Sequence, residues 1–353
     1  MAYRVIQWGA GVNGQALIRA IARHADLELV GCRVWSEAKN GVDAGTLAGI
    51  DPIGVVASNK IEQFLEMDAD VVIFCGQIRP DLRPNDEEIC ALLRSGKNVI
   101  SVTGAHSMPM AVPGDYGLQF EEACQAGGSS MAAAGINPGF MAERLAATVT
   151  GLCAEVDSVS ISESFDCSNS TADIVFDTMG FGRPLDAWTK DSEVGQMFHH
   201  LFFQLIHNVA RSLSVELAEV TWSAKAFAAS EDIVAEAGRI PAGTVAAITQ
   251  VWEGVPRDAD QIRISKHTSW VMGKNLPGHP VRSGWQIHVR GKPNLAVDVR
   301  YDPDGDMTYY SESMVGSAIA VIPEVVEAEP GFVLPRIYAP FRKRFGRASL
   351  RQR

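Results

Sequence analysis

The chain has 353 residues, of which 46% are hydrophobic and 21% are charged, as in an ordinary globular protein with a sizeable core. Its length suggests two domains. The formal net charge of −11 argues against nucleic acid or an anionic membrane as the main partner, because like charges repel. No apolar run is long enough to span a membrane, and the basic tail 342–353 is interpreted as a solvated end.

The cysteines form neither C-x-x-C pairs nor metal-like spacings, so we expect small buried hydrophobes and no metal site. This pattern favours a reducing compartment, the cytoplasm. A strand that starts at residue 4 leaves no room for a signal peptide. The six cysteines are Cys32, Cys75, Cys90, Cys124, Cys153 and Cys167.

The chain opens with a strand, a glycine-rich turn and a helix. A β-prone run at 5–8 ends in G-x-G-x-x-G, and apolar residues at helical spacing follow over 15–23. Gly9 permits the tight turn, Gly11 lets the backbone approach a pyrophosphate, and Gly14 lets the helix pack closely. The first helical amides then face the anion. We therefore predict dinucleotide binding at Gly9, Gly11, Val12, Asn13 and Gly14; the alternative is a glycine turn without a ligand.

The first part of the chain alternates strands and helices, which predicts a Rossmann-type, doubly wound parallel sheet in an α/β domain at 1–153. The expected strands lie at 27–35, 55–58, 70–75, 99–103 and 131–136, and the expected helices at 15–23, 60–67, 86–94 and 118–125.

The pattern changes after residue 153. Residues 156–166 alternate like a half-buried antiparallel strand, and residues 189–229 follow a helical period. Further strands are expected at 245–255, 261–272, 284–289 and 295–301, with a hairpin turn at 291–294. These features predict an α+β substrate and dimerisation domain at 154–315 with a mostly antiparallel sheet. A helix with an internal proline at 316–326 opens a segment, 316–353, that we expect to return to the nucleotide domain.

The end of the second strand bears on which coenzyme binds. Ser36 and Lys39 can hold a 2′-phosphate through a hydroxyl and a positive charge, and Trp35 can lie against the adenine. Glu37 offers the competing interpretation, since an acid there would bind the ribose 2′-OH and select NAD. We favour NADP, with NAD possible.

Residues that follow the next parallel strands should meet at the same edge of the sheet, where ligands bind. Glycines there allow close approach to the nicotinamide ribose, and an asparagine can satisfy the carboxamide with a donor and an acceptor. The additional cofactor-binding candidates are Cys75, Gly76, Gln77, Thr103, Gly104, Asn137 and Pro138.

Five segments together resemble the 2,4-diaminopentanoate dehydrogenase and native amine dehydrogenase family, with a first domain similar to that of dihydrodipicolinate reductase. They are V-I-Q-W-G-A-G-V-N-G (5–14), D-A-G-T-L-A-G (43–49), Thr103-Gly104, G-I-N-P-G-F (135–140) and A-V-I-P-E-V-V-E-A-E-P-G (320–331). The resemblance is loose over 165–290. It implies an NAD(P)-dependent enzyme, usually a homodimer, that interconverts a small-molecule amine and carbonyl through an imine by hydride transfer.

The chain departs from this family at one place. The family is expected to carry a carboxylate just after Thr103-Gly104, but here A-H-S-M follows, with no acid before Asp115. His106 can replace it as an acid or base near neutral pH, or it could be an ordinary loop histidine. Glu163 and Asp166 are the next carboxylates expected to reach the substrate, and either could instead be a solvated strand residue.

The second domain lacks the H-H-x-x-K and S-G-T signatures of dihydrodipicolinate reductases, and the His199-His200 pair is interpreted as surface or core. Apolar residues near the expected site favour a hydrophobic or modest-sized substrate. The substrate-binding candidates are Phe140, Phe165, Asp166, Met179 and Trp270.

Three functions follow from these observations. The leading one is an amine dehydrogenase-like oxidoreductase that carries out oxidative deamination or reductive amination. The second is a ketone, alcohol or imine reductase that does not use ammonia. The third is a non-catalytic homologue that binds NADP(H).

Overall fold

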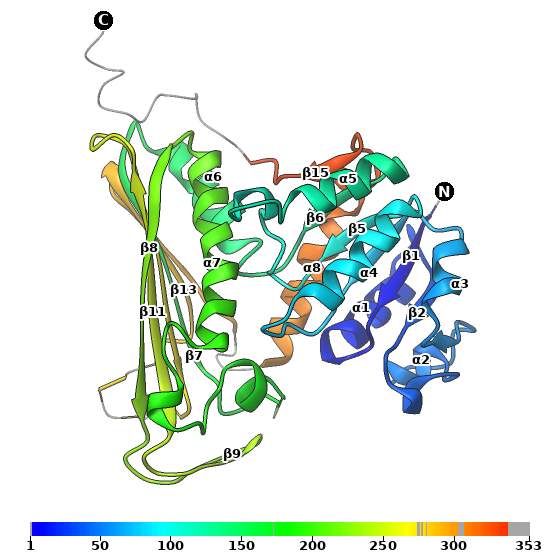
Figure 1. Cartoon of the computed structure of the whole chain (residues 1–353), viewed down its shortest axis with the longest axis horizontal. Coiled ribbons are helices and arrows are strands. Elements are labelled where there is room, and N and C mark those ends of the chain that lie inside the picture. Colours follow the sequence, from blue (N-terminus) through cyan, green and yellow to red (C-terminus); the bar gives the residue numbers. More distant parts are fainter. Residues whose placement is uncertain are drawn as a thin grey trace, which may run out of the picture. The chain divides into compact units, whose positions relative to one another are not determined.

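The computed structural model describes residues 2–171, 173–273, 276, 278–279, 281–302 and 307–337, so the basic tail lies outside the described residues. The chain forms two compact units (Figure 1). Unit 1 comprises 1–140 and 308–334, and unit 2 comprises 141–307 and 335–353.

Unit 1 is built on a seven-stranded sheet in the order β15-β6-β5-β4-β1-β2-β3, with every neighbouring pair parallel. The predicted Rossmann-type fold is therefore confirmed. Its central strands are apolar because helices cover both faces; β4 is buried at all four positions. The strands are β1 (Tyr3–Trp8), β2 (Leu27–Arg33), β3 (Ala57–Ser58), β4 (Val71–Phe74), β5 (Asn98–Ser101), β6 (Ser130–Ala133) and β15 (Gly331–Val333).

The helices of unit 1 include one from the C-terminal part of the chain. Helix α8 spans the expected internal proline, Pro323, and the Ser130 hydroxyl of β6 donates a hydrogen bond to the Val325 carbonyl (2.6 Å). The following strand, β15, extends the sheet beside β6. The helices are α1 (Val12–Arg23), α2 (Ala44–Leu47), α3 (Ile61–Glu66), α4 (Arg83–Arg94), α5 (Leu118–Gly127) and α8 (Met307–Val326).

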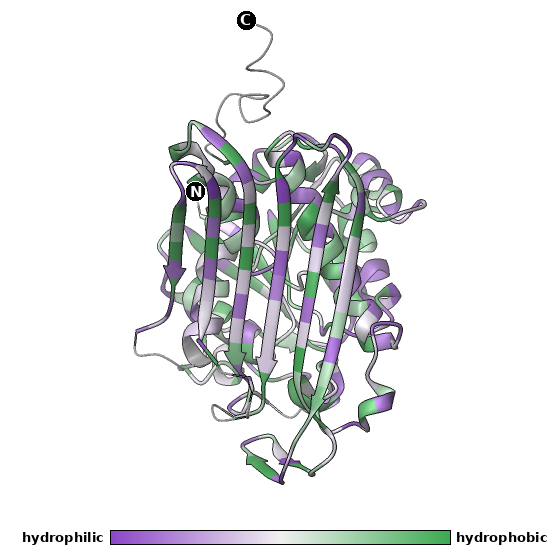
Figure 2. Ribbon diagram, turned by 90° about the vertical axis from the view of Figure 1, so that its left-hand side faces the viewer, coloured by the Kyte–Doolittle hydropathy of each residue, from purple (hydrophilic) through white to green (hydrophobic). Residues whose placement is uncertain are grey.

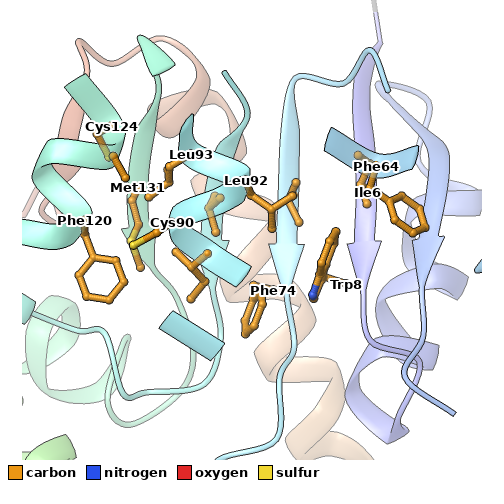
Figure 3. Packing of buried hydrophobic residues seen from close by; sticks show 14 residues of the cluster. Ile6, Trp8, Phe64, Phe74, Cys90, Leu92, Leu93, Phe120, Cys124 and Met131 are labelled. Carbon is orange, nitrogen blue, oxygen red and sulfur yellow. The ribbon is translucent and has the colours of Figure 1, made fainter. Parts of the chain in front are cut away.

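A cluster of buried side chains lies between the sheet and helices α3, α4 and α5 (Figure 3). Trp8, the last residue of β1, meets Phe64 edge-on at 5.4 Å between ring centroids and lies beside Phe74 at 6.4 Å. Leu92 of α4 and Phe120 of α5 complete this core. The core thus fixes the end of β1 at the point where the glycine-rich turn begins.

Unit 2 contains a six-stranded sheet in the order β14-β13-β7-β12-β11-β8. Only β7 and β12 among these neighbours run parallel, so the predicted, mostly antiparallel sheet is confirmed. Its strands are β7 (Glu155–Asp166), β8 (Leu217–Ala228), β11 (Val245–Pro256), β12 (Arg263–Val271), β13 (Gly284–Lys292) and β14 (Leu295–Val299). The shorter elements are α6 (Ala147–Val149), β9 (Ile233–Ala235) and β10 (Gly238–Ile240).

Helix α7 (Glu193–Ser212) packs on one face of this sheet through aromatic side chains, including Phe202, whose ring lies 4.5 Å from that of Trp252. Figure 2 shows the opposite face, where hydrophilic and hydrophobic residues alternate along the strands. The period of two gives each strand one buried and one polar side.

The helix predicted over 189–229 is wrong beyond residue 212. Helix α7 ends at Ser212, Ser214 takes a positive φ of 58°, and Leu217–Ala228 is strand β8, paired antiparallel with β11. Trp222 stands opposite Trp252 on the face that packs against α7. Small residues and alanines in β8 also fit a helical period, and only the neighbouring strand decides between the two.

The described ranges contain neither a membrane-spanning helix nor a metal-binding cluster of side chains. No helix in them is long and apolar enough to cross a membrane. In those same ranges, no group of three or more histidine, cysteine, aspartate or glutamate side chains is arranged to hold a metal ion.

Candidate functional site

The glycine-rich turn joins β1 to α1. A Cβ atom at Gly14 would lie 1.9 Å from the Gly9 carbonyl oxygen, so only glycine allows α1 to approach so closely. Gly9 has a φ of +98°, and a Cβ there would meet the Cys75 carbonyl oxygen at 2.8 Å and the Trp35 ring at 2.9 Å. A Cβ at Gly11 would meet nothing within 4 Å. The fold itself therefore requires two of the glycines, while the third faces open space.

Two side chains hold the turn in place. The buried amide of Gln7 donates from Nε2 to the Gly9 carbonyl (2.9 Å), and the Lys39 ammonium donates to the Ala10 carbonyl (2.8 Å). The sequence analysis did not identify Gln7. A lone amide within an apolar strand was a usable signal, since a buried amide needs hydrogen-bond partners.

The first turn of α1 is suited to an anion. Its N-cap is Gly11, which has no side chain with which to cap the helix, and its first turn contains no acidic residue. Asn13 is fixed from α8, where the Ser311 hydroxyl donates to Asn13 Oδ1 (2.8 Å). The N-terminal amides and the helix dipole together favour a phosphate at this position.

At the end of β2, aromatic and charged side chains form a layered cluster. The buried Arg33 guanidinium lies 5.6 Å from the Trp8 ring and 5.4 Å from the Trp35 ring. Glu88 of α4 accepts a hydrogen bond from each indole, at 2.7 Å from Trp8 and 3.1 Å from Trp35. Trp35 is thereby held against Gly9 with 45% of its surface exposed.

The side chains expected to contact the 2′ position of the ribose come directly after Trp35 in the chain. Ser36 is exposed, and Lys39 lies over the glycine-rich turn through its bond to Ala10. The Glu37 carboxylate is engaged by two amides, accepting from Asn59 (2.6 Å) and Asn40 (3.3 Å). Glu37 is thus held in a side-chain network of its own.

The other cofactor candidates follow β4, β5 and β6. Because all the strands of unit 1 are parallel, their carboxyl ends lie along one edge, in the order β6, β5, β4, β1, β2. Burial raises the pKa of Cys75 to about 12, so it is a neutral thiol. A Cβ at Gly76 would lie 2.4 Å from the Phe74 ring. The candidates along this edge are Cys75, Gly76 and exposed Gln77 after β4, Thr103 and Gly104 after β5, and Asn137 and Pro138 after β6.

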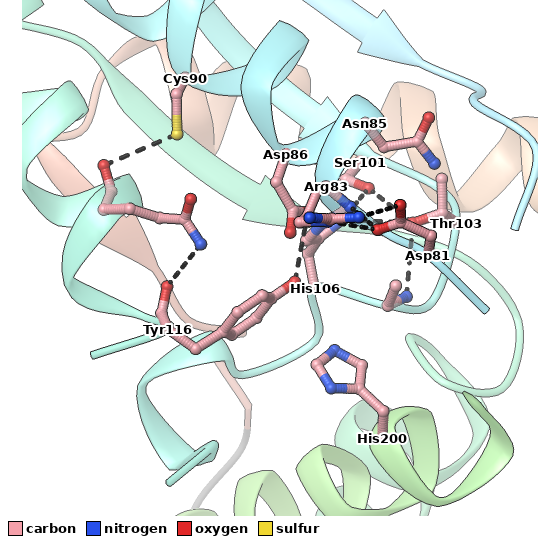
Figure 4. A network of polar contacts seen from close by, with 12 residues as sticks. Asp81, Arg83, Asn85, Asp86, Cys90, Ser101, Thr103, His106, Tyr116 and His200 are labelled. Atoms are coloured by element: carbon pink, nitrogen blue, oxygen red, sulfur yellow. Dashed lines mark hydrogen bonds and ion pairs between the residues drawn. The ribbon is translucent and has the colours of Figure 1, made fainter. Parts of the chain in front are cut away.

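His106 is fully buried in a polar network (Figure 4). Its Nε2 lies 2.8 Å from Asp86 Oδ1, and its Nδ1 lies 2.8 Å from the Ser101 hydroxyl and 3.2 Å from the Thr103 hydroxyl. The Tyr116 hydroxyl donates to the same Asp86 oxygen (3.3 Å). Sequence reasoning identified His106 but missed Asp86, which lies on α4.

In unit 2, Glu163 of β7 is also buried and receives donors from two further strands. Its carboxylate accepts from the Trp270 indole (3.0 Å) and the Trp285 indole (3.2 Å), and Lys266 Nζ lies 3.2 Å away. Burial lowers the pKa of the fully buried Lys266, while the charges of Glu163 and Glu143 oppose that shift. The alternation of β12 could have revealed Lys266, because it shares a face with buried Ile264 and Trp270.

The remaining substrate candidates differ in their surroundings. Phe165 meets Trp285 edge-on at 4.9 Å, so Glu163, Phe165 and Trp270 come together around Trp285. Asp166 instead stabilises a turn, since it accepts from the amide and hydroxyl of Ser168 and from the Gly273 amide.

Two further candidates have other surroundings. Met179 is half-buried beside Trp188, whose indole donates to its carbonyl (2.9 Å). Phe140 is 41% exposed and belongs to unit 1. The predicted substrate set therefore divides between the two units.

Comparison with known proteins gives matches over almost the whole chain. Residues 140–336 match the sequence model of the 2,4-diaminopentanoate dehydrogenase C-terminal domain, and residues 3–106 match that of the dihydrodipicolinate reductase N-terminus.

Individual relatives agree with these matches. An amine dehydrogenase of Streptomyces virginiae is 28% identical, covering 98% of this chain and 99% of the relative. A 2,4-diaminopentanoate dehydrogenase of Acetoanaerobium sticklandii is 23% identical, covering 93% and 91%. The solved structure of an amine dehydrogenase from Mycobacterium smegmatis has the same fold, with a TM-score of 0.79, 17% identity, and coverage of 97% and 98%.

The buried pair in unit 2 gives a stability prediction. Replacing Glu163 by glutamine leaves the Lys266 ammonium buried beside a neutral amide, so we expect a loss of about 3–5 kcal/mol in the free energy of unfolding. The double variant Glu163→Gln/Lys266→Met should lose less than the sum of the single variants, because neither charge is then left alone. Chemical denaturation of the four proteins measures this coupling.

The exposed ion pair between Lys292 and Glu155, 2.9 Å apart on the same sheet, is the control. Lys292→Met should cost less than about 1 kcal/mol. Equal losses at the two pairs would contradict the assignment of Glu163 and Lys266 as a desolvated pair.

Proposed function

This chain belongs to the 2,4-diaminopentanoate dehydrogenase family and is an NAD(P)-dependent, amine dehydrogenase-like oxidoreductase; we propose that its preferred coenzyme is NADP and that the edge of the unit 1 sheet holds it. A bound nicotinamide coenzyme supplies the hydride that is exchanged with a carbonyl or imine carbon. The protein contributes binding, orientation and proton transfer.

One observation carries this proposal: the empty space above Gly11 at the N-terminus of α1. The packing of the turn requires glycine at positions 9 and 14, whereas a Cβ at position 11 would meet no atom of the described residues within 4 Å. At this position the backbone has no side chain, and the helix that begins there has no acidic residue in its first turn. Both features suit the binding of a pyrophosphate.

NADP is favoured by how the side chains after β2 are engaged. Lys39 and Ser36 supply a positive charge and a hydroxyl beside the turn, while Glu37 is held by Asn40 and Asn59. A carboxylate restrained in this way is a poor partner for the ribose hydroxyls. Trp35, stacked against Arg33 and bonded to Glu88, offers an aromatic surface for the adenine.

For the substrate, we propose a small, largely apolar amine or carbonyl compound that contacts the group formed by Phe165, Trp270 and Trp285. Aromatic side chains suit an apolar body, and the carboxylate and ammonium of Glu163 and Lys266 offer polar partners at the same place. His106 and Glu163 remain the candidates for moving protons.

We further propose a homodimer that acts in the cytoplasm. The dimer is what the family resemblance implies. All six cysteines are free thiols, five of them buried, which suits a reducing compartment.

The first prediction for this function concerns turnover. The purified protein should oxidise NADPH in the presence of small aliphatic or aryl ketones, and the rate should depend on added ammonium chloride. Absorbance at the nicotinamide band measures the rate. Equal rates without ammonium would favour a ketone or alcohol reductase, and coenzyme binding without turnover on a broad panel would favour a non-catalytic homologue.

The second prediction tests whether the space beside Gly11 holds the pyrophosphate. Gly11 has φ −77° and ψ −169°, which alanine adopts readily, so Gly11→Ala should fold normally. Its methyl group would occupy the space assigned to the pyrophosphate, so NADPH affinity should fall at least about tenfold, or 1.4 kcal/mol. Calorimetric titration measures the affinity, and Gly316→Ala, which also meets nothing within 4 Å, is the control. Unchanged affinity in Gly11→Ala would refute the assigned position.

The third prediction concerns coenzyme choice. Lys39→Met should weaken NADPH binding about 10-fold to 100-fold, because a hydrogen bond to a charged group is worth about 1.5–3 kcal/mol, and should leave NADH binding nearly unchanged. Lys60→Met, at an exposed lysine before α3, should change neither. An equal loss for both coenzymes would mean that Lys39 acts only by holding the Ala10 carbonyl.

A further inference from the structure

Five polar residues of unit 1 form a continuous hydrogen-bonded chain beneath the end of β5 (Figure 4). It runs from the Tyr116 hydroxyl to Asp86 Oδ1 (3.3 Å), from Asp86 to His106 Nε2 (2.8 Å), and from His106 Nδ1 to the hydroxyls of Ser101 (2.8 Å) and Thr103 (3.2 Å). The two hydroxyls are 3.1 Å apart. Every member except Tyr116 is less than 10% exposed.

The partners define the state of the histidine ring. An ionised carboxylate only accepts hydrogen bonds, so Asp86 requires the proton on His106 Nε2. In the neutral ring Nδ1 is then an acceptor, facing two hydroxyls that can donate to it. This is the order of groups in which a carboxylate orients a histidine, and the histidine exchanges a proton with a hydroxyl.

The residues around Asp86 stabilise this arrangement of protons. Asp86 lies in the first turn of α4, where the helix dipole favours negative charge. The pKa of Tyr116 is raised, first by burial and then by Asp86, so the phenol keeps its proton and remains a donor. Burial raises the pKa of Cys90, one turn further along α4, to about 11, so it adds no charge. Phe120 of α5 closes the network with its ring edge-on to His106 at 5.4 Å.

We propose that Asp86, His106 and Thr103 form a proton relay, and that the Thr103 hydroxyl exchanges a proton with the reacting carbonyl or imine. This inference rests on the proposed function. Thr103 is the member of the chain that directly precedes Gly104, at the coenzyme edge of the sheet after β5, where ligands of such sheets bind. The relay would take the place of the carboxylate that the family resemblance leads one to expect after residue 104.

The step balances as follows in the direction of reduction. The substrate carbon receives a hydride, with its two electrons, and the substrate oxygen or nitrogen takes the Thr103 hydroxyl proton. His106 enters the step as the imidazolium, its ring having taken up one proton from water, and Thr103 Oγ1 regains a proton from Nδ1 of that ring, directly or through Ser101. His106 is left neutral with its Nε2 proton on the Asp86 side. Oxidation runs the same transfers in reverse.

A structural role for the same contacts makes different predictions. If Asp86 and His106 only anchor the loop after β5, loss of the Thr103 hydroxyl should affect folding or coenzyme affinity, and the effect on the chemical step should follow from those losses. A relay predicts a loss in the chemical step that is larger than any loss of folding or coenzyme affinity, because valine has nearly the shape of threonine but carries a methyl group in place of the hydroxyl. His106 and Asp86 act through Thr103, so they are positioning residues.

The experiment compares Thr103→Val with Thr103→Ser in the full-length protein, using NADPH and the best ketone of the turnover panel. For Thr103→Val we expect kcat to fall at least about 100-fold, the usual contribution of general acid–base catalysis, a loss much larger than any change in NADPH affinity. Thr103→Ser should stay within about tenfold.

Asp86→Asn supplies a readout that does not depend on activity. In the wild type, nitrogen NMR should find neutral His106 protonated on Nε2, and in Asp86→Asn the ring is free to take the other tautomer, with kcat reduced and KM little changed. A wild-type ring protonated on Nδ1, or full activity in Thr103→Val, would overturn the relay alone. A wild type that oxidises no NADPH with any ketone would overturn the proposed function and the relay with it.

Discussion

The close approach of α1 to the turn after β1 is the constraint on which the rest of unit 1 depends. A single methyl group at Gly14 would lie 1.9 Å from the Gly9 carbonyl oxygen, so the helix can begin where it does only because that position has no side chain. Once α1 begins there, its N-terminal amides lie at the carboxyl end of β1, beside the ends of β4 and β2. Trp8 and the aromatic core beneath it hold the strand that sets this geometry.

Much of this arrangement could be predicted because it depends on short stretches of sequence. The glycine spacing, the apolar period-two and period-3.6 runs, and the turn at 291–294 are all local, and the parallel sheet, the glycine turn and the β13–β14 hairpin agree with the structure. Strand β8 was missed for the opposite reason. Its alternation becomes decisive only when Trp222 stands beside Trp252, and nothing within residues 217–228 reveals that neighbour.

The partners of the candidate catalytic residues were missed for the same physical reason. His106 and Glu163 were identified from residue type and position, but what each can do is set by distant residues. Asp86 lies 20 positions from His106, and the two indoles that bind Glu163 lie 107 and 122 positions away. A sequence shows which groups can ionise, whereas the protons they hold depend on contacts that only the folded chain makes.

The buried position of Asp86 also bears on the use of ammonia. A carboxylate directly after Thr103-Gly104 could both attract an ammonium ion and move protons. Here the Asp86 carboxylate contacts Nε2 of His106, and the Thr103 hydroxyl lies on the other side of the ring, at Nδ1. Attraction between charges falls with distance, and a hydroxyl offers a cation only a dipole. The relay thus preserves proton transfer while giving up charge attraction at this position. Any attraction for ammonium or a protonated amine must then come from other carboxylates; in unit 2, buried Glu163 bonds to the Trp270 indole and is already paired with Lys266.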